Sequence, residues 1–141
     1  MTASDLGEIV VVDDSPEFVD ALVWAFRRLG VQPPRFTASS GDEALDLLHR
    51  LSLLPSLVLL DLNLPGLDGR SALREIRSDA AFSRLPVAVL STSDDPTDVQ
   101  TCREAGADAY LVKPVRLEAL RDKLSQLLDK LDDLSSLPFP L

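Results

Sequence analysis

The feature that most constrains this chain is a regular alternation of short buried runs with amphipathic stretches. Four runs rich in aliphatic residues, and a weaker one at 35–37, are each followed by apolar residues at three- or four-residue steps. Short aliphatic runs predict strands buried on both faces, and the intervening stretches predict helices. Since a crossover helix returns the chain between parallel strands, we expect an α/β fold that is doubly wound, with one five-stranded parallel sheet. The predicted strands are 8–12, 35–37, 57–60, 87–90 and 109–112.

Local signals mark where the helices begin. Ser15 followed by Pro16 is typical of a helix start, and Gly30 of the end of the same helix. Ser40 and Glu43 stand at capping-box spacing, which predicts that the second helix begins directly after Ser40. His49 falls on that second helix, where we interpret it as a solvated position without partners.

Composition excludes several classes of function. The chain has 23 acidic and 14 basic residues and a formal net charge of −9, which argues against a nucleic-acid surface. It contains one cysteine, so an internal disulfide is excluded. Because we find neither a leader pattern nor an apolar run of roughly 20 residues, we expect a single soluble, cytoplasmic domain without a membrane partner.

Charged and hydroxyl-bearing residues follow four of the predicted strands. The carboxyl ends of strands form the ligand crevice of an open parallel sheet, so we expect these residues to converge. Carboxylates without nearby Cys or His select a hard cation, Mg²⁺ or Mn²⁺. A lysine and a hydroxyl beside them suit an incoming phosphoryl group. The residues are Asp13 and Asp14 after the first strand, Asp61 after the third, Ser91 and Thr92 after the fourth, and Lys113 after the fifth.

These positions, with Pro114 after the lysine, resemble the receiver domain of two-component response regulators over roughly residues 9–128. The resemblance implies a flavodoxin-like fold with strand order 2-1-3-4-5. It also implies that Asp61 accepts a phosphoryl group from a phosphohistidine on a sensor histidine kinase.

The same resemblance assigns a metal site. It makes Asp14 and Asp61 carboxylate ligands of Mg²⁺, with Asp13 ligating or in the outer shell. The carbonyl of Asn63 is implied as the remaining protein ligand.

The other implied roles concern a switch. Ser91 would be the switch hydroxyl, Lys113 would contact the phosphoryl group and Tyr110 would be the aromatic switch residue. Thr92 is bulkier than the usual residue there and is expected to restrict the water that hydrolyses the acyl phosphate. The peptide bond before Pro114 is expected to be cis.

The C-terminal part suggests a second feature. We divide the chain into a receiver domain, 1–130, and a tail, 131–141, in which Leu131, Leu134 and Leu137 continue the apolar pattern of the last helix. Because this exceeds what a compact domain needs, we expect a homodimer through the last helix and the tail. The stretches 85–94 and 106–115 resemble the single-domain regulators paired with bacterial phytochromes. This resemblance implies a bacteriophytochrome kinase as partner.

We therefore expect a stand-alone receiver that acts in a phosphorelay as a signalling module rather than an enzyme. One alternative is a Mg²⁺-dependent phosphohydrolase of the haloacid-dehalogenase type, which also uses a strand-end Asp nucleophile. That class needs an Asp two residues after the nucleophile, where this chain has Asn63. A third possibility is a scaffold that is never phosphorylated.

Overall fold

The computed structural model describes residues 7–141, so residues 1–6 of the predicted receiver domain lie outside the described residues. Strands and helices alternate along it as predicted. The strands are β1 (Ile9–Val12), β2 (Phe36–Ala38), β3 (Leu57–Asp61), β4 (Val87–Ser91) and β5 (Ala109–Val112). The helices are α1 (Pro16–Arg28), α2 (Gly41–Arg50), α3 (Gly69–Ser78), α4 (Pro96–Glu104) and α5 (Leu117–Asp129), with short 3₁₀ helices η2 (Ala80–Phe82) and η3 (Leu134–Ser136).

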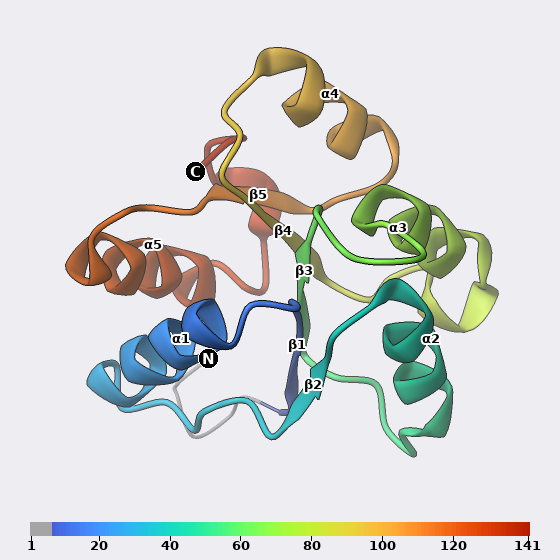
Figure 1. Cartoon of the computed structure of the whole chain (residues 1–141), viewed down its shortest axis with the longest axis horizontal. Helices are drawn as coiled ribbons and strands as arrows, with labels where there is room; N and C mark the ends of the chain where they lie inside the picture. Colours follow the sequence, from blue (N-terminus) through green and yellow to red (C-terminus); the bar gives the residue numbers. More distant parts are fainter. Residues whose placement is uncertain (1–6) are drawn as a thin grey trace.

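All five strands form one parallel sheet in the order β2-β1-β3-β4-β5, with β3 at its centre (Figure 1). This confirms the doubly wound fold and the strand order that the resemblance implies. Val12 of β1 pairs with Leu60 of β3, so the two strands end at the same level of the sheet. The connections change direction between β1 and β3, and the ends of these strands therefore flank a crevice.

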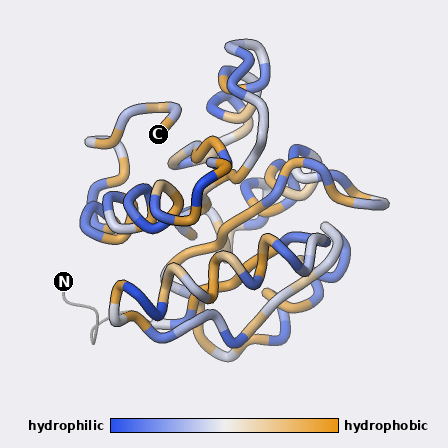
Figure 2. The backbone as a smooth tube through the Cα atoms, turned by 60° about the vertical axis from the view of Figure 1, so that its left-hand side comes forward, coloured by the Kyte–Doolittle hydropathy of each residue, from blue (hydrophilic) through white to orange (hydrophobic). Residues whose placement is uncertain are grey.

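Two layers of helices cover the sheet. Helices α1 and α5 lie side by side on one face, whereas α2, α3 and α4 cover the other (Figure 1). Neighbouring residues of β3 point into different layers, Leu59 toward α1 and α5 and Leu60 toward α2 and α3. Figure 2 shows the central strands as mostly hydrophobic, as expected for strands buried on both faces. None of the helices within residues 7–141 is long and apolar enough to span a bilayer.

The helix starts are confirmed by their capping bonds. The Ser15 hydroxyl accepts the N–H of Phe18 at 3.2 Å, and the Ser40 hydroxyl accepts the N–H of Glu43 at 3.1 Å. Strand β2 is shifted by one residue from the prediction, because Phe36 pairs with Val10 of β1. Arg35 lies just before the strand and is exposed to solvent.

The C-terminal tail does not continue the last helix. Helix α5 ends at Asp129, and the chain turns through η3 and returns to the sheet. Leu141 lies against β5 of its own chain, where its N–H donates to the Tyr110 carbonyl at 2.7 Å. The apolar residues Leu137 and Leu141 of the tail therefore pack against their own chain.

Candidate functional site

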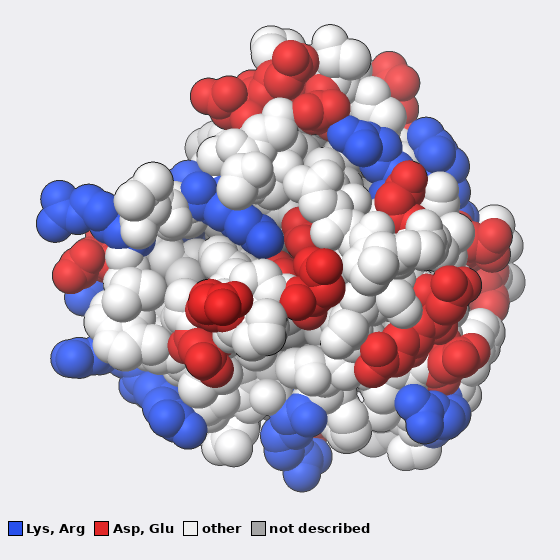
Figure 3. Space-filling model, viewed as in Figure 1, with Lys and Arg blue, Asp and Glu red and all other residues white. Residues whose placement is uncertain are grey.

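Three carboxylates lie together at the carboxyl ends of β1 and β3. Asp13, Asp14 and Asp61 each offer an oxygen within 4.8 Å of the others. Asp13 and Asp61 are buried, whereas Asp14 is exposed. Figure 3 shows acidic side chains gathered in the middle of this face, where the two strands end. We call Asp13, Asp14 and Asp61 the acidic cluster.

Lys113 is the basic residue of the site. Its Nζ donates to Asp13 Oδ2 at 2.9 Å and lies 3.5 Å from Asp61 Oδ1. The ammonium also sits 4.2 Å from the centre of the Phe18 ring, a cation–π contact that limits its movement. Lys113 thus pairs with two of the three carboxylates, and the formal charge of the site is negative.

The electrostatics of Asp61 follow from this imbalance. Burial, and next the negative charge of Asp13, raise the pKa of the Asp61 carboxyl above its ordinary value. Lys113 and the backbone N–H of Asn63 act in the opposite direction. A bound cation would remove the repulsion, and a donor set made of carboxylate oxygens fits a hard divalent ion.

The loop after β3 folds tightly over Asp61. The N–H of Asn63 donates to Asp61 Oδ1 at 3.3 Å, while the side chain of Asn63 is exposed. A Cβ on Gly69 would lie 2.2 Å from the Asp61 carbonyl oxygen, so this close approach requires glycine. The role of the Asn63 carbonyl as a metal ligand stays a prediction.

Ser91 ends β4 beside the acidic cluster. It is buried, its carbonyl accepts the N–H of Lys113 at 2.7 Å, and its hydroxyl accepts the N–H of Ser93 at 3.1 Å. The predicted hydroxyl is therefore held by a turn of its own loop. Thr92 is exposed next to it, and its effect on water access stays a prediction.

Tyr110 points inward from β5. Its side chain is completely buried, and its hydroxyl donates to the Ser93 carbonyl at 2.8 Å. Burial raises the pKa of Tyr110. Ser93 thus connects the hydroxyl of Ser91 with that of Tyr110.

Sequence reasoning missed the residues that hold this loop. The Ser93 hydroxyl donates to Asp98 Oδ2 at 2.6 Å, and Arg70 donates to Asp98 Oδ1 at 2.7 Å. These contacts join α3, α4 and the loop after β4. The signal available was the Asp95-Pro96 helix start, which places Asp98 in the first turn of α4, facing the loop.

The expectation of a cis peptide before Pro114 is wrong. Among the described residues, the cis peptide bond is Phe139–Pro140. The trans form is favoured for a bond before proline unless the surroundings select cis, and the adjoining Val115 is fully exposed. Lys113 reaches the acidic cluster with a trans bond before Pro114.

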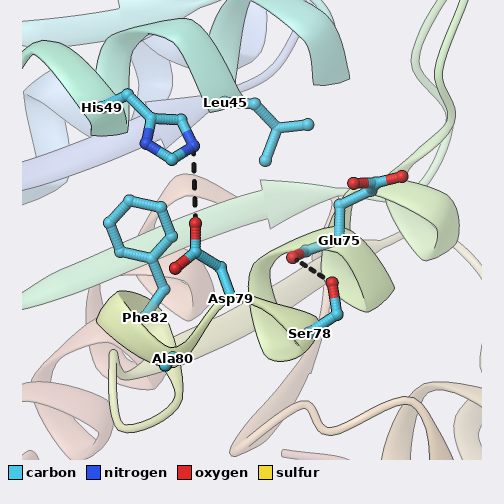
Figure 4. A pocket seen from close by; sticks show the side chains of 7 residues that line it. All are labelled: Leu45, His49, Glu75, Ser78, Asp79, Ala80 and Phe82. Carbon is cyan, nitrogen blue, oxygen red and sulfur yellow. Dashed lines mark hydrogen bonds and ion pairs between the residues drawn. The ribbon is translucent and has the colours of Figure 1, made fainter.

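His49 lies apart from the acidic cluster, in a surface pocket shown in Figure 4. Contrary to the sequence interpretation, it has partners: Nε2 lies 3.6 Å from Asp79 Oδ2, and the ring packs on Phe82 with centroids 5.0 Å apart. The imidazole therefore ties α2 to the segment after α3.

Comparisons with known proteins agree with this geometry. The family described as response regulator receiver domain matches residues 9–125. The DNA-binding response regulator MtrA of Mycolicibacterium smegmatis is 36% identical over 125 residues, 89% of this chain and 52% of MtrA. Protein PilH of Pseudomonas aeruginosa is 33% identical over 123 residues, 87% of this chain and 98% of PilH. The chain thus spans about half the length of MtrA.

Solved structures have the same fold. The phosphorylated cyanobacterial phytochrome response regulator RcpA superposes with a TM-score of 0.80 at 31% identity, covering 94% of this chain and 99% of RcpA. The Mn²⁺-bound form of response regulator Rcp1 gives 0.77 at 28% identity, covering 96% and 99%. The family match covers most of the chain, and the acidic cluster and the strand order agree with it. The chain therefore belongs to the response regulator receiver domain family.

Proposed function

We propose that this chain takes part in two-component signalling by accepting a phosphoryl group on Asp61 from a phosphohistidine of a sensor histidine kinase. The observation that carries the proposal is the position of Lys113 Nζ, within 2.9 Å of Asp13 and 3.5 Å of Asp61. The ammonium can contact a phosphoryl oxygen on Asp61 while it keeps its ion pair with Asp13. The phosphohydrolase alternative is not favoured, because the family match is to receivers and Asn63 stands where that class needs an acid.

The transfer itself requires few groups. An Asp61 oxygen attacks phosphorus, the new P–O bond forms as the P–N bond breaks, and the imidazole leaves with the electron pair. When bound at the acidic cluster, Mg²⁺ supplies the positive charge that lets a carboxylate attack an anionic donor. Lys113 would stabilise the phosphoryl oxygens, and Asp13 holds the ammonium in the site through its 2.9 Å ion pair.

The output is a shift between two packings of the loop after β4. The phosphoryl group adds roughly one to two negative charges, which attract the Ser91 hydroxyl and Lys113. Ser91 must then give up the N–H of Ser93, and Tyr110 must follow because its hydroxyl is bonded to the Ser93 carbonyl. The surface around α4, β5 and α5 changes with it.

The likeness to RcpA supports a proposal for the class of the partner kinase. A kinase of the bacteriophytochrome class, acting in the cytoplasm, suits this likeness to a phytochrome response regulator. The predicted homodimer through α5 and the tail stays a prediction. In the single chain the tail is bound to its own β5, so a dimer through the tail requires an exchange of those contacts.

The test is Mg²⁺-dependent phosphorylation by acetyl phosphate, followed by intact mass. We expect one phosphoryl group on the parent chain and none on Asp61→Asn. Asp46→Asn, on the exposed side of α2, is the matched control and should be phosphorylated normally. Steady release of phosphate from a small ester by the parent, or an unchanged yield for Asp61→Asn, would contradict the proposal.

A further inference from the structure

The outer edge of β5 is occupied by the end of the C-terminal tail. Leu141 donates its N–H to the Tyr110 carbonyl at 2.7 Å and accepts the Val112 N–H on its own carbonyl at 3.2 Å. This is the hydrogen-bond pattern of a parallel pair centred on Leu111. An edge strand with free backbone groups is a template for another extended segment, and here the template is filled from within the chain.

The side chains of the tail lie on both sides of β5. The centre of the Phe139 ring lies 6.0 Å from that of the Tyr110 ring and 4.5 Å from the Arg103 guanidinium. Leu137 and Leu141 pack against the layer that contains α5. We call the space between Tyr110 and Arg103 the aromatic slot.

Few backbone hydrogen bonds join the tail to β5. Pro138 and Pro140 have no N–H and cannot donate to the edge of β5. Within the described tail, both backbone hydrogen bonds to the strand therefore involve Leu141, which donates one and accepts the other. A hollow lined by Arg103, Ala107 and Phe139 remains beside the segment, so its packing against α4 is incomplete. A competing segment of similar shape could therefore displace the tail from the edge of β5.

We propose that the edge of β5 and the aromatic slot form a docking surface for an extended protein segment carrying an aromatic side chain, and that residues 137–141 are its internal occupant. The strand edge offers sequence-independent backbone pairing, and the slot selects the aromatic ring. A partner must displace the tail before it can bind. The tail thereby lowers the apparent affinity for a partner until it leaves.

The occupant also touches the switch. Tyr110 contacts the tail through its carbonyl and its ring, while its hydroxyl holds the Ser93 carbonyl, and Ser93 N–H holds the Ser91 hydroxyl. The tail therefore stabilises the arrangement in which Ser91 is turned to its own loop. This coupling rests on the proposed function: phosphorylation should weaken the tail, and by reciprocity removal of the tail should favour phosphorylation.

The first experiment tests docking without using phosphorylation. A chain ending after Ser136 keeps the buried Leu134 and lacks the occupant. We expect the Val112 amide to exchange its hydrogen at least about tenfold faster in this chain, because local opening is no longer required. A labelled peptide with the sequence of residues 134–141 should bind the shortened chain and restore protection, and it should bind the full chain more weakly. The same peptide with Phe139→Ala should bind the shortened chain more weakly than the unaltered peptide does.

Full-length variants guard against a shortened chain that fails to fold. Leu141→Pro removes the donor to the Tyr110 carbonyl, and Phe139→Ala empties the aromatic slot. Leu53→Ala, at a leucine that is 82% exposed in the loop before β3, is the control. Both tail variants should accelerate exchange at Val112, and the control should not.

Three results would overturn the proposal. They are equal exchange at Val112 with and without the tail, a peptide that does not bind the shortened chain, and protection that disappears on dilution as a dimer dissociates. In the last case the occupant is the tail of a second copy. With acetyl phosphate, the tail variants should reach a given phosphorylation at an about fivefold lower donor concentration. An unchanged concentration would refute the coupling, whereas no phosphorylation of any chain would refute the proposed function and leave the docking result standing.

Discussion

The two ends of the sheet differ in charge compensation: the carboxyl end has an excess of carboxylates, whereas the charge at the amino end is compensated. At the carboxyl end, three carboxylates face Lys113, and burial with the charge of Asp13 raises the pKa of Asp61. At the amino end of β4 and β5, a single guanidinium is fully matched. Arg77 donates to the carbonyls of Gly106, Phe82 and Leu85 at 2.8, 3.0 and 2.8 Å and to Asp108 at 2.7 Å.

The partner of Arg77 is itself satisfied. Asp108 Oδ2 also accepts the N–H of Val87, the first residue of β4, at 2.9 Å. The guanidinium thus joins α3, η2 and the starts of two strands, with its side chain only 17% exposed. The amino end uses charge to stabilise the fold, whereas the carboxyl end keeps unbalanced charge that a cation and a phosphoryl group can use.

The comparison predicts its largest effect at Arg77. Arg77→Leu leaves three carbonyls and the Asp108 carboxylate without their donor, so we expect the free energy of unfolding to fall by about 3 kcal/mol. Urea unfolding measures it. Arg84→Leu, at an exposed arginine in the next loop, should change it by less than about 0.5 kcal/mol. The folded fraction of the Arg77 variant should still be phosphorylated; a site that fails in folded protein would show that the two ends are coupled.

The carboxyl end should respond in the opposite direction. Without a divalent cation, Asp61→Asn removes a buried charge that repels Asp13, and the free energy of unfolding should rise by about 1 to 2 kcal/mol at pH 7. Thermal unfolding in EDTA, with Asp46→Asn as control, measures the gain. Saturating Mg²⁺ should shrink it, because the cation stabilises the parent by binding its folded state. A loss of stability in EDTA would mean that Asp61 is already compensated.

The pH dependence of this gain has a defined sign. Because the pKa of Asp61 is raised in the folded chain, the folded state binds more protons than the unfolded state just above the ordinary carboxyl range. Parent stability therefore falls as the pH rises through the raised pKa of Asp61. The advantage of Asp61→Asn should be complete at neutral pH and vanish as the pH falls toward about 4. A constant advantage across this range would contradict the raised pKa.

The carboxyl end could be predicted from the sequence because its residues follow directly from strand periodicity. Each aliphatic run has an identifiable end, and parallel strands align these ends at one edge, so Asp13, Asp61 and Lys113 had to meet. The amino end could not be predicted in this way. Three of the four acceptors of Arg77 are backbone carbonyls, which carry no sequence signal, and the fourth, Asp108, lies 31 residues away along the chain.

Two further outcomes show the same limit. The peptide before Pro114 is trans, the form favoured for a bond before proline, and the residue types around it do not specify the isomer. The apolar pattern of the tail predicts a homodimer, which stays a prediction, because hydrophobicity alone does not specify the surface that covers an apolar segment. In the single chain, backbone hydrogen bonds place Leu141 at the edge of β5.

Tyr110 lies between the two regions and should show an intermediate effect. Tyr110→Phe removes the hydroxyl that donates to the Ser93 carbonyl, so the free energy of unfolding should fall by about 1 kcal/mol. The ring and its contact with Phe139 remain. We also expect easier phosphorylation, because the loop that holds the Ser91 hydroxyl is less restrained. A variant that is less stable and unchanged in its response to acetyl phosphate would confine the role of this hydroxyl to the core.

The smallest effect is expected at His49, which belongs to neither end. Its imidazole is 58% exposed, and its contacts are the carboxylate of Asp79 at 3.6 Å and the ring of Phe82. An exposed pair of this kind contributes little, so His49→Gln should lower the free energy of unfolding by less than about 0.5 kcal/mol. Phosphorylation by acetyl phosphate should be unchanged, because the residue is not part of the acidic cluster. A clear loss of phosphorylation in a fully folded variant would show that the charge imbalance extends beyond the carboxyl end, since the effect would have to pass through α2 and the segment after α3.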